Sequence, residues 1–185
     1  MSDSSHLETL WKEFLEAAPT NDELCIIIRD IPAFRNAVWQ TLLVKGARNS
    51  DLRFIARNVE PLRAHALQRL LQREPSNEDF RCIIEFEPRV RLHMARELLR
   101  RRPTNEDLRT IIQFVGTIRH EAWQQLLAQN PTEDDLRFII AAVPPLRKRA
   151  QEVLWKCEKR RILVDRMRAA ISSEASGFYQ IWRPS

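Results

Sequence analysis

The sequence predicts an all-α fold, in which five two-helix repeats of 28 residues stack into an α-α superhelix, or solenoid. The composition points the same way, because the 185 residues include only 3 Gly against 10 Pro, and the tight turns of a β-meander call for Gly or Asn repeatedly. Two further observations, a recurring segment and a periodic apolar pattern, define the repeat itself.

A segment of the form Pro-Thr-Asn-Glu-Asp-Leu recurs along the chain at a fixed interval. Pro19, Pro75, Pro103 and Pro131 open four copies of it, and Ala47 opens a fifth copy that fills the gap between the first two prolines. Strict spacing of this kind is typical of a stacked array. The predicted units are residues 19–46, 47–74, 75–102, 103–130 and 131–158.

Apolar residues occupy the same positions in every unit. Counted from 1 at the proline position, positions 6, 9, 10, 13, 16, 20, 24 and 25 are apolar at 39 of 40 places, and Glu87 at position 13 is the exception. Positions 6, 9, 10 and 13 share one helical face, and positions 16, 20 and 24 share another. Each unit is therefore predicted to hold two amphipathic helices, helix A at about positions 3 to 13 and helix B at about positions 16 to 27.

The residues at the expected helix ends fit these boundaries. Position 2 is Ser or Thr in four units, and an acid follows three residues later, close to the capping box that satisfies the free N–H groups of a first helical turn. The chain between the two helices carries Pro or Gly, which end helix A and turn the chain. These turn residues are Pro32, Pro61, Pro88, Gly116, Pro144 and Pro145.

The two ends of the chain depart from the repeat. Residues 1–18 are expected to form an N-terminal capping helix, a half-repeat with helix-B positions and no helix A. Residues 159–185 are expected to form a basic capping helix over Lys159 to Ile171, a loop from Ser172 and an aromatic tail from Phe178 to Trp182, because a solenoid must cover its last apolar face. The whole chain is expected to be one structural domain.

Composition limits the compartment and the chemistry. No stretch approaches the roughly 20 apolar residues of a membrane span, and the segment from Met1 to His6 lacks the plan of a signal peptide. Cys25, Cys82 and Cys157 are odd in number and widely separated, which speaks against a disulfide framework or a metal site. We therefore expect a cytoplasmic protein without a cofactor, a metal or a membrane partner.

The repeat resembles those of the α-α superhelix families, the HEAT-like repeats and especially the leucine-rich repeat variant. The likeness rests on residues 130–137, Asn-Pro-Thr-Glu-Asp-Asp-Leu-Arg, followed by Ile139, Val143-Pro144, Leu146-Arg147 and Ala150, and it is echoed in the other four units, about three quarters of the chain. The variant family has shorter repeats, and its founding example carries an iron–sulfur cysteine cluster; this chain has neither feature. The resemblance implies a curved, partner-binding array and no catalytic residue.

Position 17 is Arg in all five units, and two interpretations of this ladder are open. Guanidinium groups bind phosphate well, so an array could contact one phosphate in each repeat. Position 17 also lies beside the core positions of helix B, where a buried stem would bring the cation to free carbonyl groups at the end of a helix A. We favour this structural role for the ladder, which comprises Arg35, Arg63, Arg91, Arg119 and Arg147.

Helix A carries a second charged pattern, an acid at position 5 in every unit and Arg at position 7 in four. A catalytic carboxylate pair would need two acids converging in a cleft, whereas here one acid recurs at every helix start. We expect these acids to cap helix A and to pair with arginines of adjacent A helices. The acids are Glu23, Asp51, Asp79, Asp107 and Asp135, and the arginines are Arg53, Arg81, Arg109 and Arg137.

Polar and basic side chains gather on the outward face of helix B. Positions 1 to 14 of the five units have a summed net charge of −7, and positions 15 to 28 have +11, so the B side would attract an acidic partner. By analogy with other α-solenoids, the B helices line the concave side, the usual partner surface. The candidate partner-binding residues are His65, Gln68, Arg69, His93, Arg96, Arg100, His120, Gln124, Lys148 and Arg149.

The motifs favour a binding function over a catalytic one. No Ser-His-Asp set, glycine-rich phosphate loop or HExxH motif is recognisable in the sequence. We expect a non-enzymatic helical-repeat scaffold that binds a protein or peptide on its basic B-helix face. The alternative is a nucleic-acid-binding solenoid that uses the same face, although Glu97, Glu121 and Glu152 lie there too. A HEAT-like nucleotide-processing enzyme is the weakest alternative, since it would need an acid in the concave groove beside an exposed Trp.

Overall fold

The chain is helical through most of residues 3–181, the part that this computed structural model describes. Within these residues the regular elements are eleven α-helices and four short 3-10 turns, without a strand. The helices form two compact units, which we call unit 1 (Met1–Pro103) and unit 2 (Thr104–Ser185). None of the helices in the described residues is long and apolar enough to cross a membrane.

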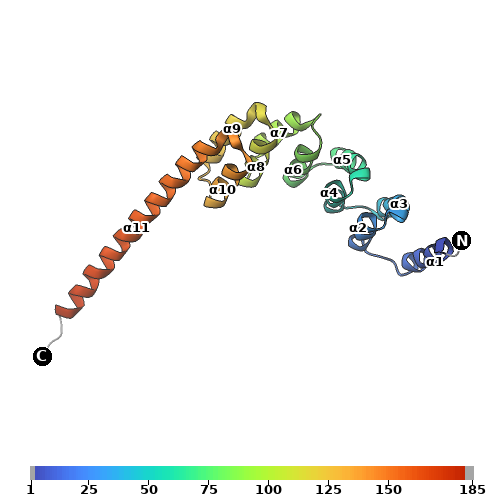
Figure 1. The fold of residues 1–185 in the computed structure, drawn as a ribbon, viewed down its shortest axis with the longest axis horizontal. Helices are drawn as coiled ribbons and strands as arrows, with labels where there is room; N and C mark the ends of the chain where they lie inside the picture. Colours follow the sequence, from blue (N-terminus) through green and yellow to red (C-terminus); the bar gives the residue numbers. More distant parts are fainter. Residues whose placement is uncertain (1–2, 182–185) are drawn as a thin grey trace. The chain divides into compact units, whose positions relative to one another are not determined.

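Helices of type A and type B alternate in both units, which confirms the predicted all-α repeat (Figure 1). After α1 (Asp3–Glu16), unit 1 has A helices α2 (Asn21–Asp30), α4 (Asn49–Asn58) and α6 (Asn77–Phe86) and B helices α3 (Arg35–Lys45), α5 (Arg63–Leu71) and α7 (Arg91–Arg100). Unit 2 has A helices α8 (Asn105–Phe114) and α10 (Glu133–Ala142) and B helices α9 (Arg119–Ala128) and α11 (Arg147–Ile181). The 3-10 turns Pro32–Phe34, Glu60–Leu62, Gly116–Ile118 and Pro144–Leu146 lead from A to B.

Each helix A packs against the helix B that follows it and against the next helix A of its unit. In unit 1, α2, α4 and α6 contact α3, α5 and α7 in turn, and α4 also contacts both α2 and α6. In unit 2, α8 contacts α9 and α10, and α10 contacts α11. Figure 1 shows the A helices of unit 1 along one edge and the B helices along the other. Both units are thus stacks of helix pairs, as a solenoid requires.

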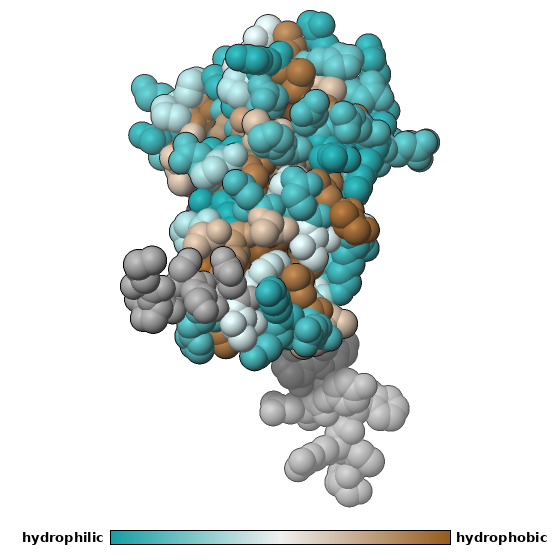
Figure 2. Space-filling model, turned by 90° about the vertical axis from the view of Figure 1, so that its right-hand side faces the viewer, coloured by the Kyte–Doolittle hydropathy of each residue, from teal (hydrophilic) through white to brown (hydrophobic). Residues whose placement is uncertain are grey.

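The repeated apolar positions form the core. In the second repeat, Leu52, Ile55, Ala66 and Leu70 at positions 6, 9, 20 and 24 are fully buried between the two helices and their neighbours. Glu87, the exception at position 13, is half-buried and caps the C-terminus of α6, where its N–H donates to the carbonyl of Ile83. Most of the side chains visible on the face in Figure 2 are hydrophilic, with apolar ones in small separate patches.

The predicted capping boxes begin the A helices. Thr20, Ser76, Thr104 and Thr132 each accept a hydrogen bond from the backbone N–H three residues later, and the acid at that position accepts one from the cap's own N–H. These reciprocal bonds satisfy two of the free donors of a helix N-terminus. Where Arg48 replaces the hydroxyl residue, Asp51 still accepts from the Arg48 N–H at 2.7 Å.

The capping acid at position 5 also joins one repeat to the next. Asp79 is fully buried, and its carboxylate accepts from Asn49 at 2.7 Å and from Arg53, both on the preceding helix A. The same contact recurs in unit 2, where Asn105 donates to Asp135 at 2.7 Å and Arg109 lies 3.3 Å from it. The expected ion pairs between adjacent A helices are therefore present, with Asn at position 3 as a further donor.

The contact between adjacent A helices helps to lower the pKa values of the buried aspartates. Burial opposes ionisation of Asp79 and by itself raises its pKa, but hydrogen bonds from Ser76, Arg53 and Asn49 together outweigh burial and lower the pKa below its ordinary value. Asp51 and Asp135 have lowered pKa values for the same reason. Since the ionised form is the one that holds adjacent A helices together, the stack depends on deprotonated aspartates.

Helix B ends in an unusual backbone conformation. Ala18, Gly46, Arg102 and Asn130, all at position 28, have φ values of 55°, 92°, 58° and 56°. This left-handed conformation closes the C-terminus of a helix. Pro19, Pro103 and Pro131 follow three of these residues, and Ala47 follows Gly46. The end of helix B is therefore fixed within two residues in each of these four places.

The C-terminal end differs from the prediction. α11 runs without a break from Arg147 to Ile181, so the loop expected from Ser172 is wrong. Figure 1 shows the second half of this helix extending beyond the other helices of unit 2. The described side chains from Lys159 to Ala169 are all exposed. Of the predicted aromatic tail, Trp182 lies outside the described residues.

Replacing one buried aspartate tests its role in stacking. Asp79→Asn keeps the shape of the side chain but removes the charge that Arg53 contacts, and we expect a loss of about 3 kcal/mol in the free energy of unfolding. Glu23→Gln, the same change at the exposed position 5 of the first repeat, is the matched control and should lose far less. Urea unfolding followed by circular dichroism measures both; equal losses would contradict the stacking role.

The lowered pKa values predict acid sensitivity. A carboxyl group whose pKa is lower in the folded chain contributes its full stabilisation above its unfolded pKa, roughly 3.9, and loses it as the pH falls through the folded value. We expect the free energy of unfolding to be level near neutral pH and to fall below about pH 4. Urea unfolding at a series of pH values should show a shallower fall in Asp79→Asn, which has lost one of these groups.

Candidate partner-binding face of the B helices

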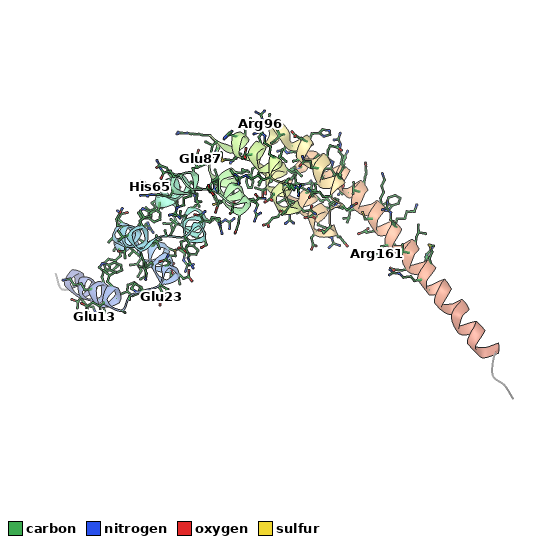
Figure 3. All side chains as sticks on the ribbon, turned by 180° about the vertical axis from the view of Figure 1, so that it is seen from behind. Glu13, Glu23, His65, Glu87, Arg96 and Arg161 are labelled. Carbon is green, nitrogen blue, oxygen red and sulfur yellow. The ribbon has the colours of Figure 1, made fainter. Side chains whose placement is uncertain are left out.

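The ten candidate partner-binding residues all have exposed side chains. Those of unit 1 lie on α5 and α7, and those of unit 2 lie on α9 and α11. Figure 3 shows His65 and Arg96 on the same edge of unit 1, and Glu23, from helix A, on the opposite edge. The exposed residues are His65, Gln68, Arg69, His93, Arg96 and Arg100 in unit 1, and His120, Gln124, Lys148 and Arg149 in unit 2.

Three of these residues share a groove between two B helices of unit 1. His65, Gln68 and Arg69 line a cavity of about 330 Å³ together with residues of α3. Its remaining lining residues are Trp39, Gln40, Leu43 and Gln72. Gln40 and Gln72 were not among the ten candidates, although their outward helix-B positions gave the same signal as Gln68.

The groove has a polar rim over an apolar floor. Trp39 keeps only 5% of its surface exposed and Leu43 is half-buried, whereas Gln40, Gln68 and Gln72 are exposed. A glutamine amide carries both a hydrogen-bond donor and an acceptor. The side chains on this rim can therefore match the N–H and C=O groups of a peptide backbone.

The basic side chains of this face differ in how freely they can bind. Within the described part of the chain, neither Arg69 nor Arg96 makes a hydrogen bond or an ion pair with another side chain. Arg100 lies 3.3 Å from Glu97, and Arg101 lies 3.6 Å from the same carboxylate. Exposed pairs of this kind contribute little to stability, so Arg100 can exchange Glu97 for an external acid.

The arginines at position 17 are engaged by the protein itself. In every repeat the Nε of this arginine donates to the carbonyl at position 10 of its own helix A, at 2.6 to 3.0 Å. Arg63 also lies over the Phe86 ring, 5.0 Å from its centroid. The carbonyls are those of Ile28, Ala56, Ile84, Ile112 and Ile140, near the C-terminus of each helix A.

A second set of structural cations was not predicted. Position 27 is Lys or Arg in the first three repeats, where Lys45, Arg73 and Arg101 donate to the carbonyl at position 1 of their own repeat. Arg101 also lies over the Phe80 ring, 4.5 Å from its centroid. The sequence alone shows that a cation recurs at position 27 of the first three repeats, so this set could have been predicted.

The described residues hold no cluster of three or more His, Cys, Asp or Glu side chains that could bind a metal ion. Cys25 and Cys82 are buried free thiols. Burial raises the pKa of Cys25 to about 12 and that of Cys82 to about 11. Neither is therefore a nucleophile at neutral pH, since reactivity requires the thiolate. Cys157 is exposed on α11.

These observations define the chain as an all-α repeat protein with a polar, basic face on its B helices. No protein-family model, curated protein or solved structure matches it. Its class therefore rests on the repeat and on the packing of its helix pairs, and its function has to be inferred from the surfaces that this packing exposes.

Two neighbouring arginines on α5 should respond differently to substitution. Arg63→Gln removes the hydrogen bond to the Ala56 carbonyl and the contact with Phe86, and we expect a loss of about 1–2 kcal/mol in the free energy of unfolding. Arg69→Gln changes an exposed side chain and should leave that free energy within experimental error. Urea unfolding of the two variants checks this; an equal loss would refute the structural assignment of position 17.

Proposed function

We propose that the chain is a non-enzymatic helical-repeat scaffold that binds an acidic, extended protein segment along its B-helix face. The observation that carries the proposal is the groove between α3 and α5, whose rim combines Gln40, Gln68 and Gln72 with His65 and Arg69. The amides suit a peptide backbone and the cations suit acidic side chains. The proposal includes membership of the HEAT-like or leucine-rich-repeat-variant solenoids, which the repeats resemble.

The spacing of the repeats supports an extended ligand. Position 22 places Gln40, Gln68 and Arg96 in a row on successive B helices of unit 1. Packed helices lie about 10 Å apart, and an extended chain advances about 3.3 Å per residue. Each repeat would therefore meet about three residues of the ligand, so that every third side chain falls near the same row.

The same surface favours a peptide over a nucleic acid. Sequence-tolerant binding of single strands uses exposed aromatic side chains on which bases stack. Trp39 and Trp123, on α3 and α9, are only 5% and 2% exposed, which leaves Trp155 of α11, 59% exposed, as the one of these three B-helix tryptophans on which a base could stack. Glu97, on α7, would also repel a phosphate backbone. We propose a cytoplasmic location as well, because the thiols of Cys25 and Cys82 are free and reducing compartments keep thiols in that state.

A displayed library of random peptides tests the proposal. We expect selection against the whole chain to enrich sequences rich in Asp and Glu, since these match the free cations of the B face. The selected peptides should bind the double variant Arg96→Gln, Arg100→Gln at least tenfold more weakly in fluorescence anisotropy.

The matched control removes two exposed arginines from A helices instead. Arg29→Gln with Arg57→Gln has the same net charge as the test variant, so it should keep the parent affinity. Failure to enrich any peptide, or equal weakening by both double variants, would refute the B-face proposal. Labelled RNA or DNA that binds more tightly than the peptides, and that weakens steeply with salt, would favour the nucleic-acid alternative.

A further inference from the structure

One side of α11 packs against α10, and the other side faces solvent. Ala150 is buried, and Leu154 and Glu158 are half-buried. Three residues further along, Arg161 donates to Glu133 of α10 at 3.1 Å. Residues three or four apart share one face of a helix, so these residues mark the side of α11 that faces α10. The opposite side, from Trp155 to Met167, is exposed, and we call it the outer face of α11.

Large apolar side chains lie on the outer face. Trp155, Ile162, Leu163 and Met167 are each at least 50% exposed. At about 100° per residue, they fall within an arc of about 140° around the helix. Trp155 also lines two shallow hollows of about 350 and 330 Å³, and the described lining residues of both belong to α11. The outer face is therefore an apolar surface that no other described helix covers.

Cations are interleaved with these apolar side chains. Lys156, Lys159 and Arg166 lie on the same arc, and all three are exposed. The Nζ of Lys159 lies 5.1 Å from the centroid of the Trp155 ring. Within the described residues, none of the three cations forms an ion pair with an acid. They are therefore available to an acidic group from outside the chain.

The acids of this stretch lie on the other side of the helix. Residues 155–169 hold six cations and two acids, a net charge of +4. The two acids, Glu158 and Asp165, each precede a cation of the outer face, so they point about 100° away from it, toward α10. Asp165 lies 3.8 Å from Arg168. The outer face between residues 155 and 169 thus carries positive charge alone.

Two kinds of side chain repeat on the outer face at an interval of seven residues. Trp155 and Ile162 are apolar, and Lys159 and Arg166 are basic. Seven residues make nearly two helical turns, so each pair forms a line along the helix. A line of apolar side chains beside a line of charges is typical of the seam between two packed helices.

The position of Lys159 distinguishes a protein helix from a lipid surface. Around the helix, Lys159 lies between Ile162 and Leu163. In a membrane interface these apolar residues would insert below the headgroups and carry the ammonium group with them. A partner helix can instead place a carboxylate opposite it. A second copy of α11 would bring like charges together, which disfavours pairing of the chain with itself.

We propose that the outer face of α11 binds an acidic amphipathic helix of a partner protein. Apolar side chains of that helix pack on Trp155 and Ile162, and its Asp or Glu residues pair with Lys159 and Arg166. The stretch from Trp155 to Met167 is about 18 Å long, which corresponds to about three turns of the partner helix. The proposal goes beyond the peptide groove, because that groove lies in unit 1 and suits an extended chain.

Two synthetic helices of three heptads each test the proposal in fluorescence anisotropy with the whole chain. Both peptides have Leu at the two seam positions of each heptad; one has Glu at the flanking positions and the other has Lys there. The chain should bind the Glu peptide at least tenfold more tightly than the Lys peptide, and salt should weaken this binding. Ile162→Asp should weaken it at least tenfold, because it places an acid in the apolar line.

Arg166→Glu and Arg168→Glu form a matched pair. The two residues lie about 200° apart around the helix, so the same charge change falls on opposite sides of α11. Both side chains are exposed, and circular dichroism should show that both variants fold as the parent does. Arg166→Glu should weaken binding of the Glu peptide about fivefold and strengthen binding of the Lys peptide, whereas Arg168→Glu should change either affinity far less.

The proposal is overturned if the chain binds neither peptide, if it binds both equally, or if the two arginine variants lose equal affinity. Tighter binding to vesicles of equimolar phosphatidylserine and phosphatidylcholine than to the Glu peptide would overturn it in favour of a membrane. Self-association that Ile162→Asp abolishes would overturn it in favour of a second copy. The variants leave the groove between α3 and α5 intact, so these results are separate from those that test the proposed function.

Discussion

A buried carboxylate at the start of helix A in the second to fifth repeats is the interaction on which the stacking of repeats depends. Such a charge is tolerated away from water only when its oxygens are hydrogen-bonded, and Asp79 meets this condition through its own cap and through donors of the preceding helix A. Both sets of donors must keep a fixed register. One extra residue inside helix A would turn its donors by about 100° away from the acid. This requirement explains why the interval of 28 residues is kept through all five repeats.

The sequence was enough to predict two kinds of contact that lie within one repeat, although it was not used to predict the position-27 cations. Thr104 and Asp107 form a capping box three residues apart, and Arg119 reaches a carbonyl seven residues back, so local spacing and the helical wheel located both. Contacts between repeats were harder. Asn49, at the start of a helix, looks like an ordinary exposed residue in the sequence, and its partner Asp79 lies 30 residues later. Predicting this pair would require knowing how closely the two A helices pack. The loop expected from Ser172 failed because weak helix breakers were taken to end a helix that the preceding residues already propagate.

The same repeat separates stability from binding. Arginines at positions 17 and 27 donate to backbone carbonyls, as Arg63 and Arg73 do, whereas Arg69 and Arg96 point to solvent on the same B helices. A count of basic residues therefore overstates the surface that is available to a ligand. The cations available to a ligand are those that remain after the carbonyls at the helix ends have found their donors. In unit 1 these cations lie beside an amide-lined groove, which gives the B face its polar and basic character together.

At four of the five junctions where a helix B ends before a helix A, a left-handed residue at position 28 and the residue after it stop the helix; at the fifth, Glu74 precedes Pro75 without a positive φ. A proline at the next position prevents the helix from continuing, so the left-handed residue itself varies among Ala18, Arg102 and Asn130. Where Ala47 replaces that proline, Gly46 adopts the conformation without strain. Glu158 and Lys159 lie at the same two positions at the end of the fifth repeat. Neither is Gly or Pro, and α11 continues through both. At this junction the chain stays helical and continues in line with the helix before it.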